Sequence, residues 1–331
     1  MNKNSNTVLK AVIASVLVVW LMLSLVFGSF NPIDWSLVKD RNGEEGNAQD
    51  AVGVFEISVV GYDSLDITSS LTLGTNFNCY VFANRAGGWI MLGGFSGGTA
   101  TIELTPQDYG YAYIVVEIPS GQSYYVDFAT TKLQNPRVVS VLYDDPDGDG
   151  YKEFIFKVDM KNIPKPASGN PKIYFYPYFL AYQKPSLNSP ADISGIGTAA
   201  VTKYIEWYVS FSSEKKAWAL AKVEISINTT DTTKITLNRV NIPGVGYLTG
   251  DAFGTPVKGT NSLTWTYNTG SNLYEANYIK YGSNQLNKFE FTTQIECQLD
   301  AGDVIAITIT LYGFTTTGTL ETLTNTVVLS A

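Results

Sequence analysis

The sequence lacks histidine altogether, has only two cysteines, and is sparing with charge, at 16% of its 331 residues. The absence of histidine excludes Ser-His and Cys-His nucleophile pairs, imidazole zinc sites and the commonest general base near neutral pH. Two cysteines supply neither a disulfide framework nor a four-thiolate metal site. We therefore expect a protein that is not an enzyme.

Basic residues are also scarce, since 22 Lys and Arg stand against 30 Asp and Glu for a net charge of −8. No basic patch relieves this balance, so we expect no nucleic-acid partner.

Period-2 alternation of apolar and polar residues dominates the chain after residue 50, and no window has a sustained helical period. Two segments in the second half are typical: residues 205–211 alternate Ile, Trp, Val and Phe with polar side chains, and residues 305–311 alternate Ile and Leu with Ala and Thr. One apolar and one polar face per strand is typical of antiparallel sandwiches. The pattern predicts an all-β fold.

The N-terminal segment has the long apolar run that a membrane-spanning helix needs. Residues 11–27 carry no charge, Lys3 and Lys10 precede them, and Asp34 is the first charge that follows. A helix of this length just crosses a bilayer, and the basic residues place the N-terminus in the cytoplasm. We expect membrane attachment through residues 11–30 and an extracytoplasmic body, on a cell surface or a virion. A retained anchor, a secretory signal cut after Gly28 and a prepilin-type leader remain open.

Lys10-Ala11 followed by VIASVLVV resembles the short leader of archaeal type IV pilins and archaellins, over roughly the first thirty residues. The resemblance implies cleavage before Val12 and a hydrophobic helix that stays on the mature protein. The sequence departs from that family at Pro32, which interrupts the helix soon after it leaves the bilayer.

Changes in composition divide the chain into five parts. We predict a membrane-spanning helix or leader at 1–30, a short helical turn and polar linker at 31–50, a first antiparallel β-sandwich at 51–183, a Pro/Gly/Ser-rich linker at 184–198 and a second antiparallel sandwich at 199–331. Each sandwich is expected to be jelly-roll or Ig-like. The pair of equal size resembles the double jelly roll of capsid proteins.

The segment DPDGDGYKE holds Asp145, Asp147 and Asp149 at alternate positions between two expected strands. Carboxylates at this spacing converge when glycines let the loop bend, and hard oxygen ligands suit calcium. The loop resembles the Asp-x-Asp-x-Asp-Gly hairpins of integrin-type repeats, which implies the carbonyl of Tyr151 and the carboxylate of Glu153 as further ligands. We expect structural Ca²⁺ here; the alternative is a solvated hairpin turn.

Other features carry weaker expectations. We expect Cys79 and Cys297 to be buried in separate cores, and residues 85–100 to form flexible glycine-rich hairpin loops that could expose a contact tip around Trp89. Asn228 begins the acceptor sequon Asn-Thr-Thr, so the sequence allows a glycan to be attached to this residue. The aromatic run at 174–182 is either a core or interface strand or a sugar-stacking platform.

These observations favour a structural subunit that associates with itself outside the membrane, most simply in a pilin-like filament. The alternatives are the coat or spike protein of a membrane-containing virus and an anchored carbohydrate-binding adhesin. The terminal segment TLTNTVVLSA has no charge after Glu321 and either pairs with a neighbouring subunit or closes its own sandwich.

Overall fold

The computed structural model describes residues 51–331 apart from 135–136, 162, 189, 243–245, 250–253 and 282–287. The predicted membrane-spanning segment at 1–30 and the predicted turn and linker at 31–50 lie outside the described residues. Within the described ranges, no helix is both long enough and apolar enough to cross a bilayer.

The described chain is built from 24 strands and two short 3₁₀ turns, η1 (Pro106–Asp108) and η2 (Thr232–Lys234). The predicted all-β fold is confirmed. Asp50–Ala331 is one compact unit. The predicted domain boundary at 184–198 therefore stays a prediction. The sheets before and after it are called the first and the second β region.

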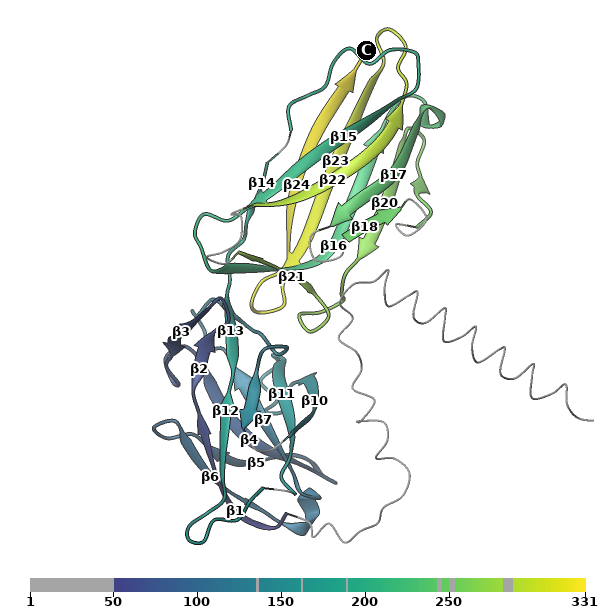
Figure 1. Cartoon of the computed structure of the whole chain (residues 1–331). Helices are drawn as coiled ribbons and strands as arrows, with labels where there is room; N and C mark the ends of the chain where they lie inside the picture. The colour runs from purple at the N-terminus through teal and green to yellow at the C-terminus, as the bar shows by residue number, and fades with distance from the viewer. Residues whose placement is uncertain are drawn as a thin grey trace, which may run out of the picture. The chain divides into compact units, whose positions relative to one another are not determined.

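The first β region, residues 53–181, contains three sheets, drawn in purple to teal in Figure 1. In spatial order, the first sheet has β6 (Thr99–Leu104), β1 (Gly53–Val59), β12 (Lys172–Tyr176) and β9 (Lys132–Gln134). The second has β10 (Arg137–Asp144), β11 (Glu153–Asp159), β7 (Tyr111–Glu117), β4 (Asn78–Arg85) and β5 (Gly88–Gly94). The third has β3 (Asp66–Leu71), β2 (Gly61–Asp63), β13 (Tyr178–Ala181) and β8 (Tyr124–Val126).

Two strand pairs in this region are parallel, β1 with β12 and β2 with β13. The prediction of a purely antiparallel sandwich is therefore wrong here. Parallel neighbours need a long connection, and the chain supplies one because these strands come from opposite ends of the region. The aromatic run expected as one strand is also divided, since Pro177 separates β12 from β13 and the two strands join different sheets.

The second β region, residues 186–330, contains two sheets with only antiparallel strand pairs among the described strands, drawn in green to yellow in Figure 1. One sheet has β14 (Ser186–Asn188), β15 (Val201–Ser210), β22 (Lys288–Cys297), β17 (Ile235–Ile242) and β18 (Gly246–Thr249). The other has β19 (Val257–Lys258), β20 (Ser262–Asn268), β16 (Lys216–Asn228), β23 (Val304–Phe314) and β24 (Leu320–Ser330), with β21 (Asn277–Tyr281) also paired to β16.

Each region has its own apolar core, formed by the inward side chains of its strands. The first core is rich in phenylalanine, including Phe77, Phe156 and Phe175, which are fully buried. The second is built on Ile, Val and Leu around Trp207 and Trp218. The alternating burial along β23 and β15 is the pattern that the sequence predicted.

The terminal strand β24 closes its own sandwich. Val327 and Leu329 are fully buried, and β24 pairs with β23 along its whole length. Its other edge receives residues from the segment expected as a linker: Ile193 bridges to Leu329, and the carboxylate of Asp192 accepts the amide of Val328. Of the two expectations for this segment, pairing within the chain is the correct one.

Candidate metal centre

The acidic segment forms the hairpin loop between β10 and β11. Gly148 and Gly150 adopt positive φ values of 78° and 93°, a conformation that side-chain-bearing residues rarely adopt. These glycines fold the loop back on itself within a few residues. The predicted convergence of the alternate aspartates depends on this turn.

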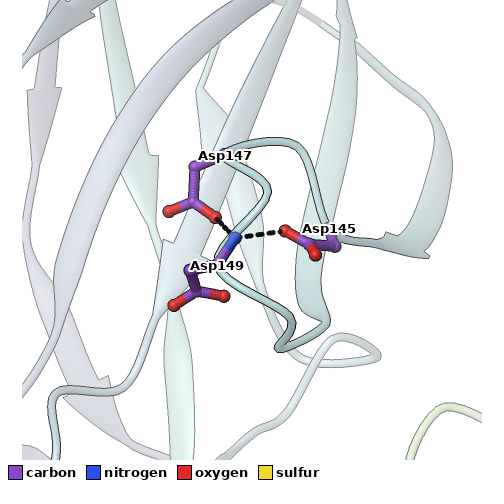
Figure 2. Close-up of side chains that lie close together, drawn as sticks. All are labelled: Asp145, Asp147 and Asp149. Carbon is purple, nitrogen blue, oxygen red and sulfur yellow. Dashed lines mark hydrogen bonds between the residues drawn. The ribbon is translucent and has the colours of Figure 1, made fainter.

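Backbone amides of the loop are tied to the aspartate side chains. The carboxylate of Asp145 accepts the amides of Gly148 at 2.7 Å, Asp149 at 3.2 Å and Gly150 at 2.9 Å. Asp147 also accepts the amide of Asp149, and Asp149 accepts that of Tyr151. Figure 2 shows the backbone nitrogen of Asp149 held between the side chains of Asp145 and Asp147.

Asp145, Asp147 and Asp149 each bring one carboxylate oxygen within 4.8 Å of the other two. Their ionisation differs because their hydrogen bonds differ. For Asp145, burial favours the neutral acid, but the amides of Gly150 and Gly148 outweigh it and lower the pKa. For Asp147, burial and the neighbouring charge of Asp149 raise the pKa. The loop therefore concentrates negative charge that the backbone only partly compensates.

Glu153, the first residue of β11, is buried, with 7% of its surface exposed. Its Oε2 atom is buried without a hydrogen-bond partner in the described part of the chain. Burial raises the pKa of Glu153 to about 8, with further contributions from the charges of Asp147, Asp149, Asp145 and Glu117. Glu153 therefore lies within electrostatic reach of all three loop aspartates.

Tyr151, the remaining predicted ligand, has a side chain that is 62% exposed. Its amide donates to Asp149 at 2.8 Å. The structure thus brings the carboxylates of the three aspartates together, while Glu153 lines the same cavity as Asp149 without belonging to that close group. The role of the Tyr151 carbonyl stays a prediction.

Glu117 is a carboxylate of this neighbourhood that the sequence analysis missed. Phe154 of β11 lies opposite Val116 of β7, so continuing the antiparallel register by one residue brings Glu153 opposite Glu117. Asn78 on the next strand donates to Glu117 at 3.2 Å. Strand pairing would have revealed this residue, because both acids stand at adjoining ends of neighbouring strands.

A cavity of about 270 Å³ adjoins the site. It is lined by acidic side chains of the first β region, by aromatic residues, and by residues of the second β region. These include Glu117, Asp149, Glu153, Tyr125, Thr316 and Thr317. The acidic neighbourhood therefore opens toward the contact between the two β regions.

The other predicted residues lie elsewhere. Cys79 and Cys297 are both free and buried, which confirms their predicted burial. Within the glycine-rich segment, Gly88–Gly94 form strand β5, so Trp89 to Leu92 lie in a strand and not in a loop. Hairpin turns precede and follow this strand, and its Ile90 and Met91 are 41% and 50% exposed. Asn228 is exposed at the end of β16. Its glycosylation stays a prediction.

No family model and no curated protein matches the sequence. Solved structures with some likeness include BcpA, the major pilin subunit of Bacillus cereus, at 12% identity and a TM-score of 0.29, with 84% of this chain and 68% of that chain covered. The major pilin SpaD of Corynebacterium diphtheriae has 13% identity and a TM-score of 0.26, with 84% and 66% covered.

A third is the collagen-binding subdomain ACE19 of an Enterococcus faecalis surface protein, at 11% identity and a TM-score of 0.24, covering 45% of this chain and 99% of that chain. At these identities and TM-scores, the likenesses establish neither a shared fold nor a shared function.

Proposed function

We propose that the protein is a non-enzymatic structural subunit of an extracytoplasmic assembly, anchored through residues 11–30 and most simply part of a pilin-like surface filament. The observation that carries the proposal is the contact between the two β regions, which we call the joint. A structural subunit under mechanical load needs its two β regions to be connected without a flexible hinge. The packing and hydrogen bonds of the joint provide such a connection.

Strand β16 contributes to both cores at its beginning. Ala217, Ala219 and Ala221 pack into the core of the first β region, whereas the alternate residues Trp218 and Leu220 belong to the core of the second. All five are buried. Small alanine side chains on one face let the first region approach closely, so the two cores meet across a single strand.

Buried hydrogen bonds reinforce the joint. The hydroxyl of Tyr125 donates to the carbonyl of Phe314 at 2.6 Å and accepts the amide of Ala219 at 3.4 Å. The Oε1 atom of Glu321 accepts the hydroxyl of Tyr182, which lies between β13 and β14, at 2.8 Å, and the indole of Trp218, within the second region, at 2.6 Å. Separating the two regions would leave the Tyr125 hydroxyl and the Phe314 carbonyl unsatisfied, which disfavours hinge opening.

Electron microscopy of the full chain tests the proposed assembly. Purified in detergent and then freed of it, the full chain should form ordered filaments or shells, whereas a variant lacking residues 1–30 should give folded monomers. A full-length preparation that stays monodisperse and monomeric after detergent removal would overturn the proposal.

Mass spectrometry of the mature N-terminus separates the filament from the virion alternative. A chain that begins at Val12 supports the pilin-like subunit, and an intact Met1 supports a retained anchor, as expected for a coat or spike protein. Protease added to intact membranes should digest residues 51–331. Complete protection of that region would contradict the extracytoplasmic orientation.

One observation favours a second candidate, a carbohydrate-binding adhesin. The rings of Tyr176 and Tyr178 lie 6.2 and 5.6 Å from that of Tyr62, and Lys132 lies 5.9 Å from the Tyr178 ring. These partly exposed rings could stack on sugars. Glycan-array binding that Tyr62→Ala abolishes would favour the adhesin; the absence of glycan binding would leave only the structural subunit.

A further inference from the structure

Two acidic hairpin loops of the described chain differ in how their charge is balanced. In the loop between β22 and β23, Lys234 lies 2.6 Å from Asp300 and 3.4 Å from Asp303. In the loop between β10 and β11, none of the aspartates pairs with a lysine or arginine, within the part of the chain that the structure describes. The only basic residue of this loop, Lys152, forms no ion pair with the aspartates among the described contacts, so their charge is not balanced by a direct ion pair.

The buried carboxyl of Glu153 adds a further acidic group without a partner beside this loop. Its Oε2 atom has no hydrogen-bond partner among the described residues, and only 7% of the residue surface is exposed. A buried polar atom without a partner is costly, and a buried charge more so. Glu117 comes opposite in the sheet and three aspartates lie in the adjoining loop, so the charges that act most on Glu153 are negative; Lys152, its neighbour in the chain, lines the same cavity but forms no ion pair with it in the described chain.

The spacing of the loop oxygens fits one cation. Calcium binds oxygen at about 2.3–2.6 Å, so two of its ligands lie at most about 5 Å apart. The carboxylate oxygens of Asp145, Asp147 and Asp149 already lie within 4.8 Å of one another. Magnesium, with bonds of about 2.0–2.1 Å, limits its ligands to about 4.2 Å and prefers to keep its waters.

We propose that one Ca²⁺ ion binds between the three loop aspartates and the buried carboxylate of Glu153, with Glu117 adding negative charge beside it. The ion supplies the partner that Glu153 Oε2 lacks and the positive charge that Lys234 supplies in the other acidic loop. It holds the loop against the end of the sheet, next to the cavity at the joint. Neither filament formation nor membrane anchoring is needed for binding.

Thermal unfolding of the full chain in detergent, first stripped with chelator and then titrated with CaCl₂ or MgCl₂, tests the site. With the affinity of about 10⁻⁴ to 10⁻³ M typical of extracellular calcium modules, 10 mM Ca²⁺ should raise Tm by about 2–5 °C. The same concentration of Mg²⁺ should raise it by less than half as much. An identical Tm in chelator and in 10 mM Ca²⁺, or a larger rise with Mg²⁺, would overturn the proposal.

Three variants locate the ion. Asp147→Asn and Glu153→Gln should each weaken calcium affinity at least tenfold and so reduce the rise in Tm at 10 mM Ca²⁺ by about half or more. Glu153→Gln removes an unpaired acid, so its Tm in chelator should be no lower than that of the unmodified chain. Asp303→Asn, in the lysine-balanced loop, should keep the full calcium-dependent rise. Retention of that rise by Glu153→Gln, or its loss in Asp303→Asn, would contradict the proposed ligand set.

Discussion

The two β regions differ in the polar side chains that they bury. Among the described residues, the buried carboxylates Asp108, Asp127 and Glu153 all lie in the first β region, whereas the buried polar residues of the second are the uncharged Thr229 and Thr293. Two of the three acids have a basic partner, since Asp108 pairs with Arg85 and Asp127 with Lys280. The first region therefore combines packing with buried charge, and the second relies on packing.

The two regions also differ in the length of their strands and in how their loops are held. The second β region pairs long strands such as β23 and β24 over eleven residues. The first divides its strands over three smaller sheets, with loops such as η1 and the acidic hairpin fixed by side-chain hydrogen bonds. Stability should thus respond to core truncation in the second region, and to pH and ions in the first.

The largest effect is expected from truncating the second core at the joint. Trp218→Ala should lower the free energy of unfolding by about 4 kcal/mol, because it empties a fully buried site and leaves Glu321 without its indole donor. Trp89→Ala in the first region is the matched control, since this ring is only half-buried and packs edge-on against Tyr113 over a small cluster, and it should cost about 1 kcal/mol. Urea denaturation of the full chain measures both; equal losses would contradict the assignment of Trp218 to the core.

Asp108→Asn should cost about 2 kcal/mol at pH 7, because Asp108 accepts two bonds from Arg85 and the amide of Thr105. Burial opposes ionisation of Asp108, but the hydrogen bonds from Arg85 and Thr105 prevail and lower its pKa in the folded chain. A lowered pKa stabilises the fold above the unfolded value, near about 3.9, and this stabilisation is lost as pH falls through the folded value.

The unmodified chain and Asp108→Asn should therefore differ at pH 7, and the difference should shrink as pH falls from about 4 through the lowered pKa of Asp108. Denaturation curves recorded across this range check the expectation. A difference that is independent of pH would mean that the charge of Asp108 does not contribute to the free energy of unfolding. The buried charges of the first region would then not explain a difference in stability between the regions.

Tyr125→Phe should cost about 1.5 kcal/mol, since it leaves the buried carbonyl of Phe314 without its donor across the joint. Tyr278→Phe is the control, because that hydroxyl donates to Leu273 within the second region. Only the first change should separate the unfolding of the two regions, seen as two transitions when tryptophan fluorescence and circular dichroism are followed together. Coincident transitions in Tyr125→Phe would show that packing alone couples the regions.

The smallest effect is expected at the surface ion pair of Lys215 with Asp66, which also links the regions. Both groups are partly exposed, so water and salt screen their attraction. Lys215→Met should change stability by no more than the error of a denaturation curve, at low and at high salt. A loss that salt abolishes would show that surface charge, and not only buried contacts, fixes the joint.

The sequence predicted the second β region better than the first because one face of its strands is buried and the other is not. Alternation in residues 305–311 reports this directly, and β23 has the predicted faces. In the first region, β7 and β11 are each buried on both faces over part of their length, as at Val115 and Ile155, so period-2 patterning fades. Parallel pairing also leaves no local sign, because it depends on segments far apart in the chain.

The acidic site was predictable in its local part only. Asp145, Asp147 and Asp149 follow from spacing within one loop, and the structure brings them together. Glu117 could not be found in this way, since its place opposite Glu153 depends on the register between β7 and β11. Equally, spacing could not reveal that Glu153 is buried without a partner.

The parallel pairing of β1 with β12 also sets the order in which the protein can mature. Glu56 lies opposite Lys172, so β1 has no partner on that edge until the ribosome has made almost the whole first region. At roughly 5–20 residues per second, this interval is on the order of ten seconds, during which an apolar strand waits with an open edge. A newly made chain would therefore depend on β6, its antiparallel neighbour on the other edge, or on a chaperone to stay free of aggregation.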